Sequence, residues 1–152
     1  MRRQQAGFTL IEILLVVAII GIITAIATPM FLSYYQGAQV RVAAEEVATF
    51  LNQGRQLAIS QNSLVCVHIT TTAMHYHLGT CAAGATWTGP GTDASGNIAV
   101  PAGITLSPTN VEVTFNYLGG STAGATYTIT HTSSAKLLHV VVNLSGRVNV
   151  TP

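Results

Sequence analysis

The sequence has few charged residues and no strong excess of either sign. Only 7% of its 152 residues are Asp, Glu, Lys or Arg, against about 25% in an average soluble domain. Beyond residue 60, the cations Lys136 and Arg147 are balanced by the acids Asp93 and Glu112. The chain as a whole therefore has no basic field that would attract nucleic acid.

Groups for catalysis are equally sparse. Beyond residue 60 the only acids are Asp93 and Glu112, and no serine lies in the context of a nucleophile elbow. The histidines come without an evident nucleophile and orienting partner, and nothing resembles a nucleotide site. We therefore predict no catalytic residues, no cofactor and no enzymatic activity.

One long apolar run stands out against this background. Phe8 to Thr28 are 21 residues with a single ionisable group, Glu12, which is about the length of a helix that crosses a bilayer. A cleaved secretory signal would be shorter and would end in small residues. An ordinary anchor has no use for a carboxylate, which is costly near hydrocarbon unless it is paired. The run therefore predicts a membrane segment whose acid needs a partner.

A short basic leader precedes Gly7 and Phe8, and Glu12 follows within the apolar run. This arrangement resembles the class III signal of type IV prepilins and type II secretion pseudopilins. The resemblance implies that a prepilin peptidase cuts between Gly7 and Phe8 and that Phe8 is then N-methylated. It also implies that Glu12 meets the Phe8 amine of a neighbouring subunit in a helical filament, a pairing that low dielectric favours.

The same resemblance implies partners and a location. The partners are other pilin or pseudopilin subunits, contacted through the first helix, the prepilin peptidase and the inner-membrane assembly platform. The chain is expected to cross the inner membrane once, with its head in the periplasm, and then to enter a pilus or pseudopilus. Arg2 and Arg3 fit a cytoplasmic leader by the positive-inside tendency.

Beyond the apolar run the first helix is predicted to continue. Pro29 removes one helical hydrogen bond and clashes with the carbonyl of Ala25, which predicts a kink or a locally melted turn. From Val40 to Ala58, apolar residues recur at three- and four-residue steps on one stripe. We predict four segments: the leader 1–7, a transmembrane and assembly helix 8–29, its amphipathic continuation 30–60, and a β-rich globular head 61–152.

Leu64 to Leu78 alternates in the manner of a β-hairpin that turns at Thr70 to Ala73. With Ile69 opposite Met74, one face of the hairpin is apolar and should cover the helix. The other face places His68 across from His75, and Cys66 across from His77. These side chains are of the types that bind zinc. Histidines on a solvated face are nevertheless common, and oxidation would remove Cys66, so we predict no metal site.

The two cysteines, Cys66 and Cys81, both lie in the part expected outside the cytoplasm. That compartment is oxidising in many bacteria, so the first interpretation is a disulfide that closes a short loop. Two free thiols in a reducing setting are the alternative. The bridge needs the chain to turn back at Gly79-Thr80, and it could shift the register of the hairpin nearby.

The remaining chain predicts further antiparallel strands. Residues 82–97 are rich in turn formers, and Trp87 among them either covers the core edge or the disulfide, or contacts a partner. Strands are predicted at 98–106, 111–117, 126–131 and 137–144, with a closing strand at 148–150 after a two-residue turn at Ser145-Gly146. The fold class is therefore α+β, a long N-terminal helix packed on an antiparallel β-sheet domain, with the pilin-like form that the resemblance implies.

The C-terminal half combines residues 113–116, a glycine-rich turn and the valine-rich residues 140–148. This pattern is similar to that of the FimT and pseudopilin-H group of minor pilins. It implies a minor subunit, in a tip or priming complex. Some FimT-like pilins bind DNA through Gly-Arg-x-Arg, of which residues 146–149 keep only the first arginine. DNA uptake by a competence pilus, with phosphate contacts from Arg147 and Lys136, is therefore the alternative function.

Overall fold

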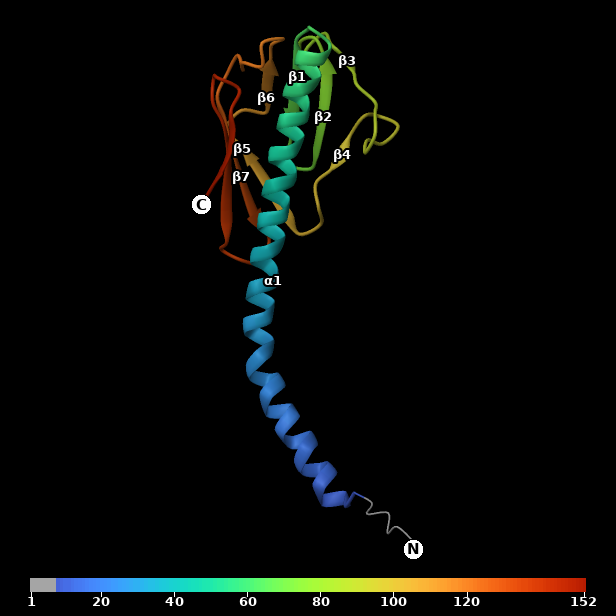
Figure 1. Ribbon diagram of the computed structural model, residues 1–152, viewed down its shortest axis with the longest axis vertical. Helices are drawn as coiled ribbons and strands as arrows, with labels where there is room; N and C mark the ends of the chain where they lie inside the picture. The colour runs from blue at the N-terminus through green and yellow to red at the C-terminus, as the bar shows by residue number, and fades with distance from the viewer. Residues whose placement is uncertain (1–7) are drawn as a thin grey trace, which may run out of the picture. The chain divides into compact units, whose positions relative to one another are not determined.

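The computed structural model describes residues 8–152 (Figure 1). One helix, α1 (Leu10–Ser60), is followed by strands. The strands in chain order are β1 (Val65–Ile69), β2 (Ala73–Leu78), β3 (Ala85–Thr86), β4 (Ile98–Ala99), β5 (Ile104–Pro108), β6 (Glu112–Phe115), β7 (Ala125–His131), β8 (Leu137–Val142) and β9 (Val148–Thr151). The chain divides into two compact units, Met1–Tyr35 and Gln36–Pro152, called below the N-terminal unit and the C-terminal unit.

The first turn of α1 is capped by Thr9. Its Oγ1 accepts a hydrogen bond from the backbone N–H of Glu12 at 3.3 Å, and its carbonyl accepts one from the N–H of Ile13 at 3.3 Å. A threonine followed three residues later by a glutamate is the sequence pattern of a capping box. Glu12 therefore lies in the first turn, where the helix dipole favours a negative charge.

α1 continues through Pro29 without interruption. The predicted alternative of a locally melted turn at this proline is therefore wrong. Nearby threonines bond to their own helix: Thr24 Oγ1 donates to the carbonyl of Ile20 at 2.8 Å, and Thr28 Oγ1 donates to that of Thr24 at 2.7 Å. Such back-bonding satisfies the hydroxyls within an apolar segment of the helix.

Two antiparallel sheets and the last part of α1 form the C-terminal unit (Figure 1). The first sheet has the order β3-β2-β1-β6, with β4 also paired to β2, and the second has the order β5-β7-β8-β9. The predicted register of the first hairpin is confirmed, since Ile69 pairs with Met74 and His68 with His75. The predicted α+β class, with a long helix packed on antiparallel strands, is confirmed as well.

The single strand predicted over 98–106 is wrong. Two strands form there, of which β4 pairs with β2 in the first sheet and β5 pairs with β7 in the second. Between them Pro101 has no N–H to give to a ladder, and Gly103 has a φ of +82°, a conformation that suits glycine. The segment therefore carries the chain from one sheet to the other.

The last hairpin also differs from its prediction. The N–H of Asn143 donates to the carbonyl of Arg147 at 3.0 Å, and the N–H of Gly146 donates to the carbonyl of Asn143 at 2.8 Å. Three residues, 144–146, therefore make the turn, in place of the predicted two. Gly146 has a φ of +75°, as expected for the last residue of a three-residue hairpin loop. A Cβ at Gly146 would also collide with the carbonyl oxygen of Gly119.

One cluster of buried residues joins α1 to both sheets. The helix contributes Val40, Ala43, Ala44, Val47, Phe50, Leu51 and Ala58, and the largest strand residues are Tyr76, Tyr127 and Phe115. The helical members are those of the predicted apolar stripe. All members of the cluster lie between residues 40 and 142, so the C-terminal unit contains its own core.

Candidate functional site

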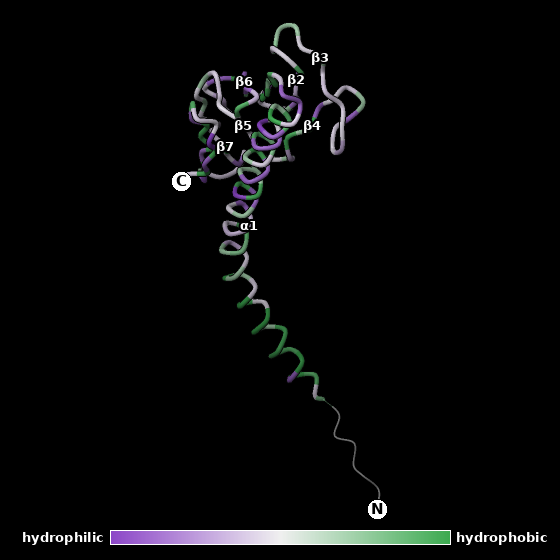
Figure 2. The backbone as a smooth tube through the Cα atoms, turned by 45° about the horizontal axis from the view of Figure 1, so that its top comes forward, coloured by the Kyte–Doolittle hydropathy of each residue, from purple (hydrophilic) through white to green (hydrophobic). Residues whose placement is uncertain are grey.

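The candidate functional surface of the N-terminal unit is its apolar helical segment. Every residue from Phe8 to Tyr35 is exposed, and Figure 2 shows the hydrophobic colour along this part of α1. In the part of the chain that the structure describes, α1 is the one helix long and apolar enough to cross a membrane. So large an apolar surface is unfavourable in water. The segment therefore needs lipid or other protein around it.

Glu12 is the only charged residue in this segment. It lies one helical turn beyond Phe8, and its side chain is exposed, as is that of Phe8 at 79%. The hydrogen bond from its backbone N–H to Thr9 was missed in the sequence, although the spacing Thr-x-x-Glu gives the signal. Gly7 lies outside the described residues, so the predicted cleavage between Gly7 and Phe8 has no structural description.

The predicted disulfide between Cys66 and Cys81 is present, with the two Cα atoms 5.2 Å apart. The chain turns back directly after β2, where Gly79 has a φ of +105° and donates its N–H to the carbonyl of Leu64 at 2.7 Å. The shift in register that the bridge could have caused does not occur, because Leu78 still pairs with Val65 and His77 with Cys66. The bridge therefore ties the loop after β2 to β1 without distorting the hairpin.

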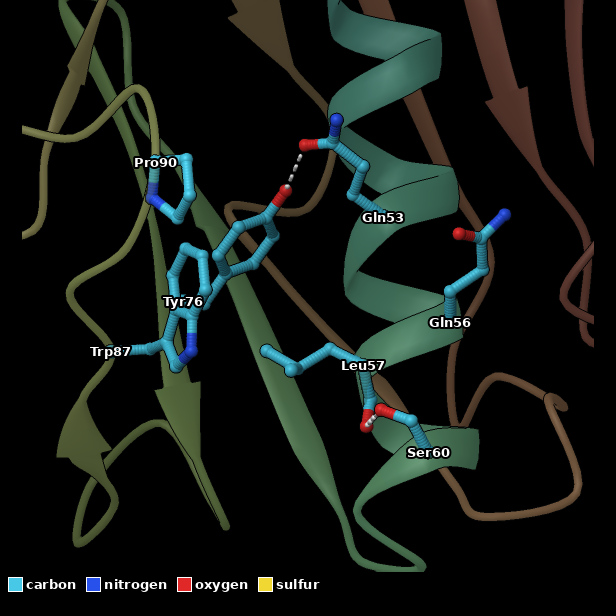
Figure 3. A pocket seen from close by; sticks show the side chains of 7 residues that line it. All are labelled: Gln53, Gln56, Leu57, Ser60, Tyr76, Trp87 and Pro90. Carbon is cyan, nitrogen blue, oxygen red and sulfur yellow. Dashed lines mark hydrogen bonds between the residues drawn. The ribbon is translucent and has the colours of Figure 1, made fainter.

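Trp87 covers an edge of the core, the first of its two predicted roles. Its ring lies edge-on to that of Tyr76, with 5.5 Å between the centroids. Beside the two rings lies a groove of about 390 Å³, which Figure 3 shows between α1 and the loop that carries Pro90. The residues that line it are Gln53, Gln56, Leu57, Ser60, Tyr76, Trp87 and Pro90. None of these side chains is a carboxylic acid, a histidine, a lysine, an arginine or a cysteine.

The two cations proposed for DNA contact lie far apart. Lys136 precedes β8, beside Gly37 of α1, and Arg147 lies just before β9, opposite Asn143 at the other end of β8. At about 3.3 Å per residue, their places along the strand differ by roughly 20 Å. Both side chains are exposed, and Nε of Arg147 donates to Oδ1 of Asn149 at 3.1 Å. The structure therefore does not join them in one basic patch.

The histidines of the first sheet do come together. His68, His75 and His77 each place a ring nitrogen within 4.8 Å of the others, and Oε1 of Glu112 lies 3.8 Å from Nδ1 of His68. Burial, and then the nearby His68 and His77, hold the pKa of His75 below its ordinary value. Sequence reasoning missed Glu112, because only the pairing of β1 with β6 brings it beside His68.

Two protein families match this chain. Residues 2–28 match the prokaryotic N-terminal methylation motif, and residues 43–146 match the type II transport protein GspH family. A fimbrial protein of Pseudomonas aeruginosa is 39% identical over 77 residues, which are 51% of this chain and 49% of that protein. Type II secretion system core protein G of the same species is 50% identical over 46 residues, 30% of this chain and 32% of that protein. The chain thus spans half or less of the length of these relatives.

Solved structures with the same fold include minor pilins and minor pseudopilins. The type IV minor pilin FimU of Pseudomonas aeruginosa has a TM-score of 0.59 at 19% identity, covering 76% of this chain and 90% of that one. The minor pseudopilin EpsH of Vibrio cholerae has a TM-score of 0.59 at 15% identity, covering 74% and 95%. These identities establish a shared fold. Because the second family match covers more than half of the chain, this protein belongs to the GspH family of pilin-like subunits and carries their N-terminal methylation motif.

Proposed function

We propose that this protein is a minor pilin or pseudopilin that assembles through α1 into a type IV pilus or a type II secretion pseudopilus. The observation that carries the proposal is the exposed apolar segment from Phe8 to Tyr35, joined to a C-terminal unit that has its own core. Lipid can surround such a segment before assembly, and the apolar helices of neighbouring subunits can do so afterwards.

Processing at the N-terminus prepares the segment for assembly. A prepilin peptidase cuts between Gly7 and Phe8, and the new amine of Phe8 is N-methylated. Before that step the protein crosses the inner membrane once, with its C-terminal unit in the periplasm, where the Cys66–Cys81 disulfide is stable. The match to the methylation motif over residues 2–28 supports this sequence of events.

Glu12 sets the register between subunits in this proposal. Its carboxylate is exposed on the first turn of α1, and in a filament core it would be surrounded by apolar side chains. A charge in such surroundings is costly unless an opposite charge lies beside it. The methylated amine of Phe8 in the neighbouring subunit supplies that charge, so only one axial offset between helices satisfies both groups.

A minor subunit, in a tip or priming complex, is the position that we propose. The fold is shared with the minor pilin FimU and the minor pseudopilin EpsH, which supports a minor rather than a major subunit. The inner-membrane assembly platform and other pilins or pseudopilins are its partners.

Replacement of Glu12 by alanine tests the proposal. In cells with the cognate assembly machine, we expect Glu12→Ala to insert in the membrane as the parent does and to be lost from sheared filaments. Glu46→Ala is the matched control, because Glu46 is an exposed glutamate of α1 outside the apolar segment. Equal incorporation of the Glu12 variant and the parent would rule out this role of the acid. Mass analysis of the mature N-terminus tests the cleavage and methylation separately.

DNA binding is the second candidate function, and the exposure of Arg147 beside the last hairpin is the observation in its favour. Binding through phosphates weakens steeply with salt. We therefore expect a salt-dependent gel shift by the purified chain that Arg147→Ala reduces. Arg41→Ala is the control, since Arg41 is exposed but paired with Glu45. The absence of a shift at low salt would remove this candidate.

A further inference from the structure

Three imidazole rings face one another on the side of the first sheet that does not pack on α1. His75 and His77 are two residues apart on β2 and so share a face, and His68 on β1 pairs directly with His75. The rings of His68 and His75 are stacked with 4.7 Å between centroids, and those of His75 and His77 meet nearly edge-on at 4.8 Å. One nitrogen of each ring lies within 4.8 Å of the other two.

The hydrogen bonds at the rim of this cluster leave lone pairs available inside it. Nδ1 of His77 lies 3.2 Å from the carbonyl oxygen of Gly84. A carbonyl can only accept, so Nδ1 carries the ring proton and Nε2 keeps its lone pair. Nδ1 of His75 is buried and, within residues 8–152, has no hydrogen-bond partner. An unsatisfied buried nitrogen is unfavourable, and a bound cation could satisfy this ring.

Glu112 extends the row of side chains on the far side of His68. In the sheet, His68 pairs with His75 on β2 and with Glu112 on β6, and the carboxylate oxygen is 3.8 Å from Nδ1 of His68. A carboxylate behind a histidine ring commonly accepts its N–H, which orients the ring for a metal on the opposite nitrogen. Its negative charge would also offset part of the charge of a dication.

In place of the absence of a metal site expected from the sequence, we propose that His68, His75 and His77 bind a divalent transition-metal ion of the zinc type. Glu112 would be the outer support of His68. Three histidines with water in the fourth position are an established zinc coordination. Tetrahedral zinc at about 2.0–2.1 Å from each nitrogen separates the nitrogens by about 3.4 Å. The distances between the ring nitrogens are now at most 4.8 Å, so each has to shorten by no more than about 1.4 Å. Rotation of the stacked His68 and His75 rings can supply this change.

The chemistry of the surroundings favours a metal bound by imidazoles alone. Cys66 lies opposite His77 in the register, but its sulfur is bonded to Cys81 and is not available as a thiolate. The disulfide also joins β1 to the loop that follows β2, which helps to hold His68 and His77 in place.

Zinc titration of the untagged full-length protein in detergent, without reductant, tests the proposal. Calorimetry should show one bound zinc per chain, and cobalt in its place should give the visible absorption of a tetrahedral site. His68→Asn and His77→Asn should each weaken zinc binding by about 100-fold or more, and Glu112→Gln by about 10- to 100-fold. His139→Asn is the matched control, because His139 lies on β8 of the other sheet, beside Thr128.

The competing outcomes are distinct. The proposal is overturned if zinc binds no tighter than about 1 mM, if the His139 variant weakens binding as much as the others, or if binding requires prior reduction of the disulfide. His68 and His77 are partly exposed, so their variants should fold, and thermal denaturation without metal verifies this. If the His75→Asn variant folds, its zinc binding should weaken as much as that of the His68 and His77 variants. If it does not fold, the His68 and His77 variants decide the test.

Discussion

Gly54 on α1 lies against Val67 on β1, so closely that a Cβ on this glycine would be 2.5 Å from Cγ2 of the valine. The added Cβ of Gly54 would also be 3.0 Å from Cε1 of Tyr76. Both neighbours are buried in the core, so neither side chain can swing into solvent. The helix therefore approaches the first sheet at a position where the absence of a side chain sets the distance between them.

Gly54→Ala should destabilise the C-terminal unit. Overpacking a filled core costs about 1–3 kcal/mol, which exceeds the gain of about 1 kcal/mol from replacing glycine within a helix. Denaturant unfolding measures the change. Gln56→Ala, on the exposed side of the same turn, should stay within about 0.5 kcal/mol of the parent. An unchanged or raised stability of the Gly54 variant would mean that the core accommodates a methyl group.

Reduction of the Cys66–Cys81 disulfide should lower the stability of the C-terminal unit. The two cysteines are 15 residues apart, and closure of such a loop is worth about 3 kcal/mol through the unfolded state. Thermal unfolding with and without reductant measures the loss. In the double variant Cys66→Ala/Cys81→Ala, the reductant should have no effect. A parent protein whose melting temperature ignores reductant would contradict the expectation.

Tyr76 and Tyr127 form a matched pair for testing buried hydroxyls. Oη of Tyr76 donates to the carbonyl of Phe50 at 2.8 Å, whereas the buried Oη of Tyr127 has no hydrogen-bond partner among residues 8–152. Tyr76→Phe should cost about 1 kcal/mol. Tyr127→Phe removes an unsatisfied polar group and should be neutral or stabilising. Denaturant unfolding measures the stability of the two variants. A larger loss for Tyr127→Phe than for Tyr76→Phe would contradict the hydrogen bonding described for these two hydroxyls.

The C-terminal unit should lose stability in alkali. Burial raises the pKa of Tyr76 and of Tyr127 above the ordinary value, which is about 10. Above that pH the unfolded chain releases these protons while the folded chain retains them, so the free energy of unfolding falls. Above about pH 10, the free energy of unfolding falls by about 1.4 kcal/mol per pH unit for each tyrosine. Below that pH, the stabilisation from the protonated tyrosines is fully present. Melting temperatures across this range, with Tyr76→Phe showing a shallower decline, test the effect.

Local patterns in the sequence were enough to predict the helix and the first hairpin. The stripe from Val40 to Ala58 gives the buried face of α1, because a helix repeats its faces every three to four residues. The alternation around Ile69 and Met74 gives the register of β1 and β2, because a slip by one residue would expose the apolar face. Both features depend on residues that are close in the sequence.

Features that depend on distant pairing could not be predicted. Residues 98–106 have the composition of one strand, and only the positions of β2 and β7 decide that β4 and β5 join different sheets. Glu112 likewise reaches His68 through a pairing across more than 40 residues. The carbonyl oxygen of Gly119 lies against Gly146 and leaves no room for a Cβ there, a contact that no local pattern contains.

The order of the second sheet has a consequence for aggregation. Its two edges are β5, which ends at Pro108, and β9, which is followed by Pro152. Proline cannot donate a backbone hydrogen bond to an incoming strand, so it discourages growth of a sheet beyond its edge. In the proposed function, in which the protein is crowded in a membrane and polymerises through one helix, edges that resist amyloid-like stacking are an advantage. Under that proposal, assembly depends on α1, and resistance to aggregation depends on the edges of the second sheet.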